Sequence, residues 1–351
     1  MNWGRKKNVI GLDIGSSSVK LVELKEGRNG YQLENLGIAP LPPEAIVDGA
    51  LMDSVTIIDT VRDLVTSNTK TKDVVTSVSG HSVIVKKITL PFMTEAELTE
   101  SIQWEAERHI PFDINDVNIA FQILGSGTEN PELMDVILVA AKKDIINDYI
   151  SVIMESGLTP VVIDIDSFAI ENMLGINYDI GKEEIVAIVN VGAGVTNINI
   201  LKNNISAFTR DIFKGGNQIT EEIQRQLHID YEEAEKLKVG DKADASVQPV
   251  IQDLLKASSE SLSIEIGNSL DFFQSTATYQ KMSKIYLSGG GSKVRDFDVI
   301  LQQQLGIPVE MANPFNKVEY NEKKFDLEYL REIGPIMGVA VGLASRKVGD
   351  Q

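Results

Sequence analysis

The chain has 351 residues, of which 43% are hydrophobic and 24% charged, so it can bury a large core in two to three domains or one bilobed unit. Its 51 acidic side chains outnumber 33 basic ones, and the net charge of −18 argues against a surface that binds nucleic acid or anionic lipid. The absence of cysteine excludes disulfides, thiolate zinc sites and a thiol nucleophile.

We expect a cytoplasmic protein with no direct membrane insertion. The longest apolar stretch, residues 185–201, is interrupted by Asn190, Asn197 and Asn199, and a spanning helix needs about 20 mostly apolar residues. The basic residues at 5–7 could begin a signal peptide, but Asp13 interrupts the apolar stretch that follows them too early.

The first half of the chain alternates strand-like and helical patterns. Thr94 and Glu97 form the pattern of a capping box, which predicts that a helix begins there and continues to about His109. The patterns predict strands at 9–14, 19–24, 31–38, 74–78, 82–90, 117–124 and 134–140, and helices at 54–67, 94–109 and 142–156. The elements from about 80 to 160 form a small α+β insertion.

The second half repeats the opening pattern and then becomes mainly helical. The patterns predict strands at 186–191, 195–200, 205–213 and 285–288, and helices starting near 216 and at 231–239, 249–279, 294–305 and 332–346. Asp13 and Asn190 occupy equivalent places in the two repeats, about half the chain apart, which predicts two related lobes. Each repeat has a glycine-bearing turn, and the two turns can face each other across a cleft.

The first turn carries Asp13, Gly15–Ser18 and Lys20. Such a turn can present backbone N–H groups to a phosphate, with Lys20 on the terminal phosphates and Asp13 holding a magnesium water. The alternative is an ordinary hairpin with a surface lysine. The second turn, 192–196, repeats this design and favours a triphosphate held from both sides; the alternative is a duplicated hairpin without a ligand.

Two further motifs fit a nucleoside. Gly289 and Gly290 allow a base or ribose to approach the backbone, and Lys293 could lie over a purine by cation–π attraction. Glu235 and Lys238 share one helix face and could hold a ribose and a base edge. The alternatives are a strand-to-helix connection and a surface ion pair.

Together these motifs resemble the actin-like ATPase superfamily over nearly the whole chain. The insertion lies where the FtsA-like branch carries its own, in the cell-division protein FtsA and in type IV pilus assembly proteins of the PilM family. The stretch Glu-Ala-Glu-Arg-His-Ile-Pro-Phe at 105–112 is similar to the PilM family in particular.

The resemblance implies an α/β fold of the two-lobed actin-like kind, with duplicated ribonuclease-H-like lobes and a small α+β insertion. We expect the first lobe at 1–80, an FtsA-type insertion at 81–160, a return to the first lobe at 161–184, the second lobe at 185–332 and a closing helix of the first lobe at 333–351.

The resemblance also implies ATP or ADP with Mg²⁺ in the cleft. The nucleotide-binding residues that it implies are Asp13, Gly15, Ser16, Ser17, Ser18, Lys20, Gly192, Ala193, Gly194, Val195, Thr196, Gly215, Gly216, Asn217, Glu221, Glu235, Lys238, Gly289, Gly290 and Lys293. Asp13 and Asn190 would hold magnesium through water. Asp166 matches the residue that positions the attacking water, although it also fits a helix N-cap.

Position 190 departs from the family pattern, because the second loop normally begins with Asp. An amide binds a magnesium water more weakly than a carboxylate and cannot lower the pKa of that water. We therefore expect nucleotide binding with slow or no hydrolysis, so whether the protein is an ATPase is left open.

The implied function is that of an ATP-binding cytoplasmic scaffold of type IV pilus assembly. It would dock the N-terminal cytoplasmic peptide of the inner-membrane protein PilN between the first lobe and the insertion, and so be recruited to the membrane. Pilus assembly and retraction motor ATPases and the platform protein are further expected partners. The alternatives are a polymerising ATPase like actin or MreB, an FtsA-like cell-division protein and a sugar or acetate kinase.

Trp104 lies off the apolar stripe of its predicted helix. It is either an anchor for a partner protein, with Phe112 nearby, or packed against a neighbouring strand.

Overall fold

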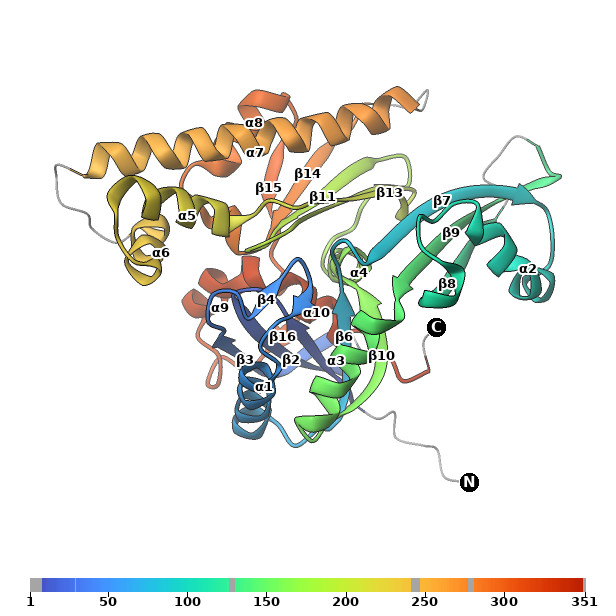
Figure 1. Cartoon of the computed structure of the whole chain (residues 1–351), viewed down its shortest axis with the longest axis horizontal. Helices are drawn as coiled ribbons and strands as arrows, with labels where there is room; N and C mark the ends of the chain where they lie inside the picture. Colours follow the sequence, from blue (N-terminus) through green and yellow to red (C-terminus); the bar gives the residue numbers. More distant parts are fainter. Residues whose placement is uncertain (1–7, 29, 126–129, 241–246, 277–280, 350–351) are drawn as a thin grey trace.

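The computed structural model describes residues 8–28, 30–125, 130–240, 247–276 and 281–349. Within them, two large sheets stand in separate lobes and a smaller sheet projects from their side (Figure 1). In strand order, the first large sheet contains β10 (Thr159–Ile165), β6 (Asp73–Val78), β1 (Ile10–Ile14), β2 (Ser18–Glu26), β3 (Tyr31–Pro40) and β16 (Glu319–Tyr320). The second contains β13 (Ile205–Ile212), β12 (Thr196–Lys202), β11 (Ile185–Val191), β14 (Lys284–Ser288) and β15 (Val309–Met311).

Both large sheets begin with the same unit, as the internal repeat predicts. β1, β2 and β3 are consecutive antiparallel strands, and so are β11, β12 and β13. β6 then pairs in parallel with β1, and β14 pairs in parallel with β11. Asp13 lies opposite Lys20 in the first unit and Asn190 lies opposite Asn197 in the second, so the two polar anchors occupy corresponding places.

The insertion forms a sheet in the order β7 (Val83–Pro91), β9 (Leu133–Lys142) and β8 (Val117–Gly125), covered by α2 (Glu95–Glu107). Both bonds of the predicted capping box at Thr94 and Glu97 are present. Leu98, Ile102 and Ala106 face a core that belongs to the insertion alone. Trp104 points away from this core and is 73% exposed, so packing against a neighbouring strand is wrong.

Helix α3 (Lys143–Glu155), which we expected within the insertion, packs on the first lobe. It contacts α1 (Ser54–Asn68) and β10, and its side chains Tyr149, Val152 and Ile153 join the core of the first sheet. A short hairpin of β4 (Ile46–Val47) and β5 (Ala50–Leu51) lies beside them. The separate core of the insertion therefore ends near Lys142, because the helix that follows buries its apolar face elsewhere.

The helices of the second lobe cover the second sheet. They are α5 (Gly216–Leu227), α6 (Tyr231–Val239), α7 (Gln248–Thr276) and α8 (Phe297–Leu305). Residues Gly290–Lys293 form a short 3-10 turn, η2. The helix predicted at 294–305 begins only at Phe297, because Asp296 before it has a left-handed φ of +59° that a helix cannot contain. The predicted end of α7 at residue 279 lies outside the described residues.

The single helix predicted at 332–346 is wrong. The chain instead forms α9 (Leu327–Ile333), a 3-10 turn η3 (Gly334–Met337) and α10 (Gly338–Ala344). Pro335 lies inside η3 and cannot donate the backbone hydrogen bond that a continuous helix needs. The segment before it also returns to the first lobe earlier than expected, since β16 pairs with β3.

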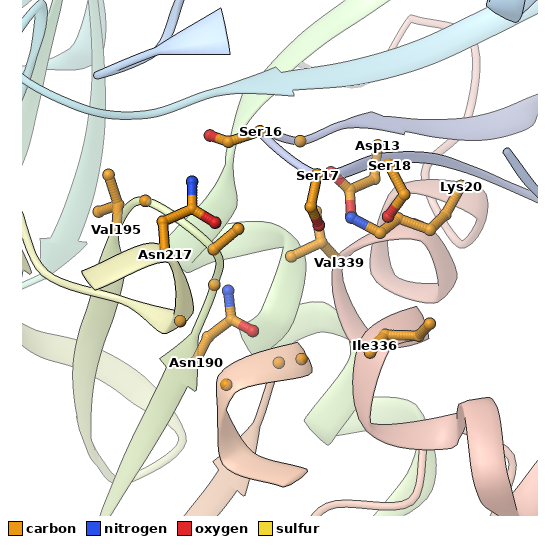
Figure 2. Close-up of a pocket in the computed structure, with 18 of the residues that line it drawn as sticks. Asp13, Ser16, Ser17, Ser18, Lys20, Asn190, Val195, Asn217, Ile336 and Val339 are labelled. Carbon is orange, nitrogen blue, oxygen red and sulfur yellow. The ribbon is translucent and has the colours of Figure 1, made fainter. Parts of the chain in front are cut away.

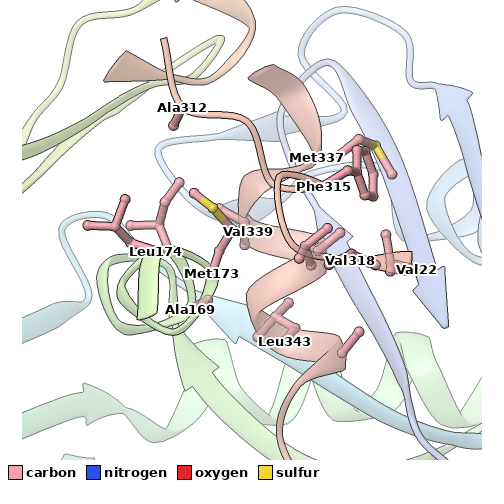
Figure 3. Close-up of a cluster of buried hydrophobic side chains, with 14 of the residues drawn as sticks. Val22, Ala169, Met173, Leu174, Ala312, Phe315, Val318, Met337, Val339 and Leu343 are labelled. Atoms are coloured by element: carbon pink, nitrogen blue, oxygen red, sulfur yellow. The ribbon is translucent and has the colours of Figure 1, made fainter. Parts of the chain in front are cut away.

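A shared core joins the two lobes (Figure 3). Helices α4 (Asp166–Asn177) and α10 cross between the sheets, with Ala169 and Met173 of α4 packed beside Val339 and Leu343 of α10. The two helices approach so closely that a Cβ on Gly342 would lie 1.6 Å from the carbonyl oxygen of Ala169. Only glycine fits at this crossing.

Gly342→Ala should lower the free energy of unfolding by more than about 3 kcal/mol, because the new methyl group meets backbone that cannot rotate away. Gly175→Ala on α4 is the matched control, since a Cβ there meets nothing within 4 Å, and it should leave stability unchanged or raise it by up to about 1 kcal/mol. Urea unfolding of both variants measures the difference. Equal midpoints for the two variants would contradict the proposed crossing.

Helix α4 also carries a partly buried carboxyl group between the lobes. The pKa of Glu171 is raised from 4.5 to about 7, mainly because burial disfavours the charged form and also because Asp164 is nearby. The hydrogen bond that Asn199 Nδ2 donates to Glu171 at 2.9 Å lowers the pKa and only partly offsets burial. Because the folded state holds this proton more tightly than the unfolded state, folding stability falls as the pH rises from about 4.5 to about 7.

Glu171→Gln reproduces the neutral form of this side chain. The variant should match the original protein in melting temperature near pH 4.5 and exceed its stability by about 3 kcal/mol at pH 8, which is the shift from 4.5 to about 7 expressed as free energy. Thermal unfolding of both proteins at the two pH values tests this. A stability difference that does not change with pH would show that Glu171 ionises normally in the folded protein.

Candidate functional site

A cavity of about 590 Å³ lies between the lobes, and turns from both of them line it. Figure 2 shows Asp13, Ser17, Ser18 and Lys20 gathered on one side and Asn190, Val195 and Asn217 on the other. The two predicted turns meet here, since a Cβ on Gly194 would lie 3.3 Å from Ser16 Oγ. The central expectation of the sequence, that both glycine turns face one space, is confirmed.

The first turn joins two antiparallel strands and orients a charged pair. Asp13 and Lys20 lie opposite each other on β1 and β2, and Lys20 Nζ lies 3.3 Å from Asp13 Oδ2. A Cβ on Gly15 would lie 2.9 Å from Lys20 Nζ, so the glycine leaves room for the lysine to cross the turn. Ser16, Ser17 and Ser18 complete this wall of the cavity.

The second turn is held by the start of helix α5. The backbone N–H groups of Gly216 and Asn217 donate to the carbonyl oxygens of Gly192 and Ala193 at 2.9 and 2.8 Å. These two N–H groups are therefore occupied within the protein. Ala193, Gly194 and Val195 keep their positions on the cavity wall.

Three residues predicted to bind nucleotide do not line the cavity. The hydroxyl of Thr196 is buried and donates to the carbonyl oxygen of Lys214 at 2.7 Å. Gly215 lies behind the second turn, where a Cβ would be 2.5 Å from the carbonyl oxygen of Gly192. Glu221 is exposed on α5. Thr196 and Gly215 shape the turn, and Glu221 contributes nothing to the lining.

Glu235 and Lys238 on α6 line the far end of the cavity and form an ion pair with each other. Lys238 Nζ also donates to Thr220 Oγ1 at 2.9 Å and to the carbonyl oxygen of Gly216 at 3.2 Å. The lysine thereby connects α6 to the start of α5. The pair is only partly exposed, unlike the surface ion pair that the sequence left as the alternative.

The third turn, which contains Gly289 and Gly290, places its backbone on the wall of the cavity between the lobes. Gly289 has a φ of +89°, and a Cβ there would lie 2.2 Å from the carbonyl oxygen of Val191. Its N–H donates to the carbonyl oxygen of Pro335 at 2.7 Å, so the turn also contacts η3. Gly290 and Lys293 line the cavity as predicted.

Asp166 is the first residue of α4 and lines the cavity. The N-cap position of the helix is held by Ile165 and Asp166 lies within the first turn, so the N-cap interpretation is wrong. Instead, Asp166 Oδ1 accepts a hydrogen bond of 2.6 Å from Ser77 Oγ. The carboxylate is thus held at the cavity floor by β6.

The charge of Asp166 acts on Asp13 across this floor. Burial raises the pKa of Asp13, the Lys20 ammonium lowers it, and the charge of Asp166 raises it again. Tyr149 from α3 lines the same floor, and burial together with both aspartates raises its pKa. The floor of the cavity therefore combines one lysine with two acidic groups.

Sequence reasoning missed the apolar wall of the cavity. Ile336 from η3 and Val339 from α10 line it, together with Gly291 and Val294 beside the third turn (Figure 2). Ile336 and Val339 lie far from the glycine turns in the sequence, and the error of one continuous final helix hid them. The available signal was the glycine at every fourth position near the chain end, Gly334, Gly338 and Gly342, since it indicates a helix packed closely against other backbone.

In the described part of the chain, no group of three or more His, Cys, Asp or Glu residues could hold a metal ion. Asp13 and Asn190 both line the cavity. Among the described helices, none is long and apolar enough to cross a membrane.

Residues 11–348 match the family model described as type IV pilus assembly protein PilM. A solved PilM–PilN type IV pilus biogenesis complex contains a chain 31% identical to this one, with a TM-score of 0.88 over 99% of this chain and all of that one. The chain belongs to the PilM family of type IV pilus assembly proteins. The resemblance seen in the sequence is confirmed.

More distant structures share the PilM fold. The ethanolamine utilization protein EutJ from Carboxydothermus hydrogenoformans is 17% identical, with a TM-score of 0.57 over 97% of this chain and 89% of that one. MreB5 of Spiroplasma citri bound to ADP is 14% identical, with a TM-score of 0.50 over 93% and 98%. The predicted two-lobed actin-like fold is confirmed.

Lys20→Met should raise the pKa of Asp13, because it removes the cation that lowers it, whereas Asp166→Asn should lower that pKa. Carbon-13 NMR of carboxyl-labelled aspartate measures both changes. Lys87→Met is the control, since its ammonium pairs with Asp135 in the insertion at 2.9 Å. Shifts of equal sign in the Lys20 and Asp166 variants would contradict this arrangement of charges.

Proposed function

We propose that this PilM-family protein is a nucleotide-dependent scaffold of type IV pilus assembly. The single observation that carries the proposal is the interlobe cavity of about 590 Å³, in which two glycine turns from equivalent places in the repeat meet. Its occupant is ATP or ADP. The solved MreB5 structure of the same fold was obtained with ADP.

The cavity suits a nucleotide from one end to the other. Lys20 and the serine turn would bind the terminal phosphates, the second turn would contact them from the opposite lobe, and Gly290 and Ile336 would border the base. Magnesium would be held mainly by phosphate oxygens and water, because the described residues offer no cluster of three ligands. Asp13 and Asn190 would contact the metal through its bound water. Magnesium would neutralise phosphate charge.

Hydrolysis is proposed to be slow. Position 190 offers an amide where a carboxylate would activate a magnesium-bound water, and Asp166 is the nearest candidate to orient the attacking water. Binding rather than turnover would then set the state of the protein. Nucleotide would favour the closed arrangement of the lobes by bridging them.

The partner would be the N-terminal cytoplasmic peptide of PilN, which recruits the protein to the inner membrane. A second cavity, of about 320 Å³, lies where the insertion joins both lobes, and apolar residues Val83, Ile84 and Val85 of β7 line it. β7 is an edge strand of its sheet, so its backbone can pair with an extended peptide. The relative in the solved PilM–PilN complex supports PilN as the partner.

The two cavities share part of their lining. Ser79, Asp166 and Asn197 border both of them. A nucleotide that repositions these residues would therefore change the peptide cavity directly. Motor ATPases and the platform protein would respond to that state as further partners.

Isothermal titration with MgATP should show binding, and Lys20→Ala should weaken it about tenfold or more, because a charged hydrogen bond to phosphate contributes about 1.5–3 kcal/mol. Lys87→Ala, a lysine of the insertion, should leave the affinity unchanged. Wild-type protein that does not bind MgATP would overturn the proposal. Filaments in light scattering with ATP would favour the polymerising alternative.

A synthetic PilN N-terminal peptide from the same pilus system should bind with an affinity that depends on MgATP. Ile84→Glu should weaken the peptide and leave MgATP binding unchanged, because Ile84 lines only the second cavity. Lys86→Glu is the control on the same strand, since Lys86 is exposed and lines neither cavity. Equal weakening by the two variants would place the peptide elsewhere.

A further inference from the structure

A row of hydrogen-bonded side chains crosses the second sheet and ends on the first lobe. Asn190, Asn197 and Asp211 lie opposite one another on the neighbouring strands β11, β12 and β13. Asn190 Nδ2 donates to Asn197 Oδ1 at 3.0 Å, and Asn197 Nδ2 donates to Asp211 Oδ1 at 2.9 Å. The backbone N–H of Gly80, between β6 and β7, donates to the other oxygen of Asp211 at 3.2 Å.

The direction of every bond in this row is fixed from one end. The N–H of Gly80 can only donate, and the Asp211 carboxylate can only accept. Asn197 must therefore turn its NH₂ group toward Asp211, which leaves its oxygen facing position 190. Both asparagines are more than nine-tenths buried, which limits how well water can replace a missing donor.

Position 190 therefore needs a hydrogen-bond donor. Asparagine supplies one, whereas an ionised aspartate would place a carboxylate against Asn197 Oδ1. If the Asn197 amide rotated, its NH₂ group would donate to an aspartate at position 190. Its oxygen would then face the Asp211 carboxylate, and two acceptors would again lie against each other. A carboxylate fits at one end of the row and not at both.

We propose that Asp211 is the positioning residue that fixes position 190 as an amide, through Asn197, and that the row links the second phosphate turn to the first lobe at Gly80. The second turn has an amide at position 190, and the carboxylate of the row is Asp211, two strands away. There Asp211 accepts the bond from Gly80 of the first lobe. Asn190 keeps its own oxygen available to the cavity. This inference rests on the proposed function only where it assigns the Asn190 oxygen to the nucleotide cavity.

The row also lies between the two cavities. Asn190 and Asn197 line the interlobe cavity, while Asn197, Asp211 and Gly80 line the cavity beside β7. Next to Gly80, the ring of His81 stacks on Phe213, with centroids 3.3 Å apart. A change at position 190 would therefore reach the contact between the insertion and the second lobe.

A double-mutant cycle in nucleotide-free protein tests the inference. Asn190→Asp should lower the melting temperature by about 3–8 °C, because it leaves a carboxylate facing Asn197 Oδ1 with no donor between them. Asp211→Asn alone should change it by less than about 2 °C, because all three amides can rotate and Asn190 Oδ1 then accepts from Asn197. The double variant should return to within about 2 °C of the original protein. With both changes the row reverses: Asn197 donates to Asp at 190, and Asn at 211 donates to Asn197 and accepts from Gly80.

Asn204→Asp combined with Asp211→Asn is the matched control. It makes the same two chemical changes, but Asn204 lies seven residues from Asp211 along β13 and its preceding turn, about 23 Å of extended chain. Its effects should add. Additive losses in the 190/211 pair as well would overturn the inference, and recovery in that pair alone would support it.

The cycle needs no ligand, so it is separate from the proposed function. If wild-type protein failed to bind MgATP, the proposed function would fall while the melting temperatures still decided the hydrogen-bond direction. If MgATP bound normally and the losses added, only the inference about Asp211 would fall.

Discussion

The close crossing of α10 over α4 is the constraint on which the molecule depends. A backbone carbonyl of Ala169 lies where Gly342 would carry a side chain, so the two helices touch through their backbones between the sheets. A similar contact holds α10 against β1, since a Cβ on Gly11 would lie 2.2 Å from the carbonyl oxygen of Ala340. These contacts set the distance between the lobes, and therefore the width of the cavity at whose floor Asp13 and Asp166 meet.

Within that fixed frame, the cavity mixes two kinds of wall. Backbone turns rich in glycine and serine supply small polar surfaces, while Ile336 and Val339 supply an apolar side. Many of the inward-facing donors are already bonded inside the protein, as the N–H groups of Gly216 and Asn217 show. Lys20 brings a positive charge to the first turn, which is why this side chain carries so much weight in the proposed nucleotide site.

The insertion gives the family member a surface of its own. Its core is separate from those of the lobes, and its α2 presents Trp104 to solvent. It joins the body beside β13, where Gly80 and Asp211 bond. A partner bound at that junction would contact the same residues that reach the interlobe cavity, which offers a short physical route between the two sites.

Local chemistry determined much of this protein. The capping box at Thr94, the equivalent strands around Asp13 and Asn190, and the glycine turns follow from residues near each other in the chain, so the sequence predicted the lobes, the insertion and most cavity residues. Pro335 was an available local signal against one continuous final helix. The sequence could not show that α3 packs on the first lobe, or that Thr196, Gly215 and Glu221 leave the cavity lining. Only the tertiary structure decided these, because packing between segments that are separated in the sequence selects which face of each element is buried. The link from Asn190 through Asn197 to Asp211 is of the same kind, since it exists only when three strands align.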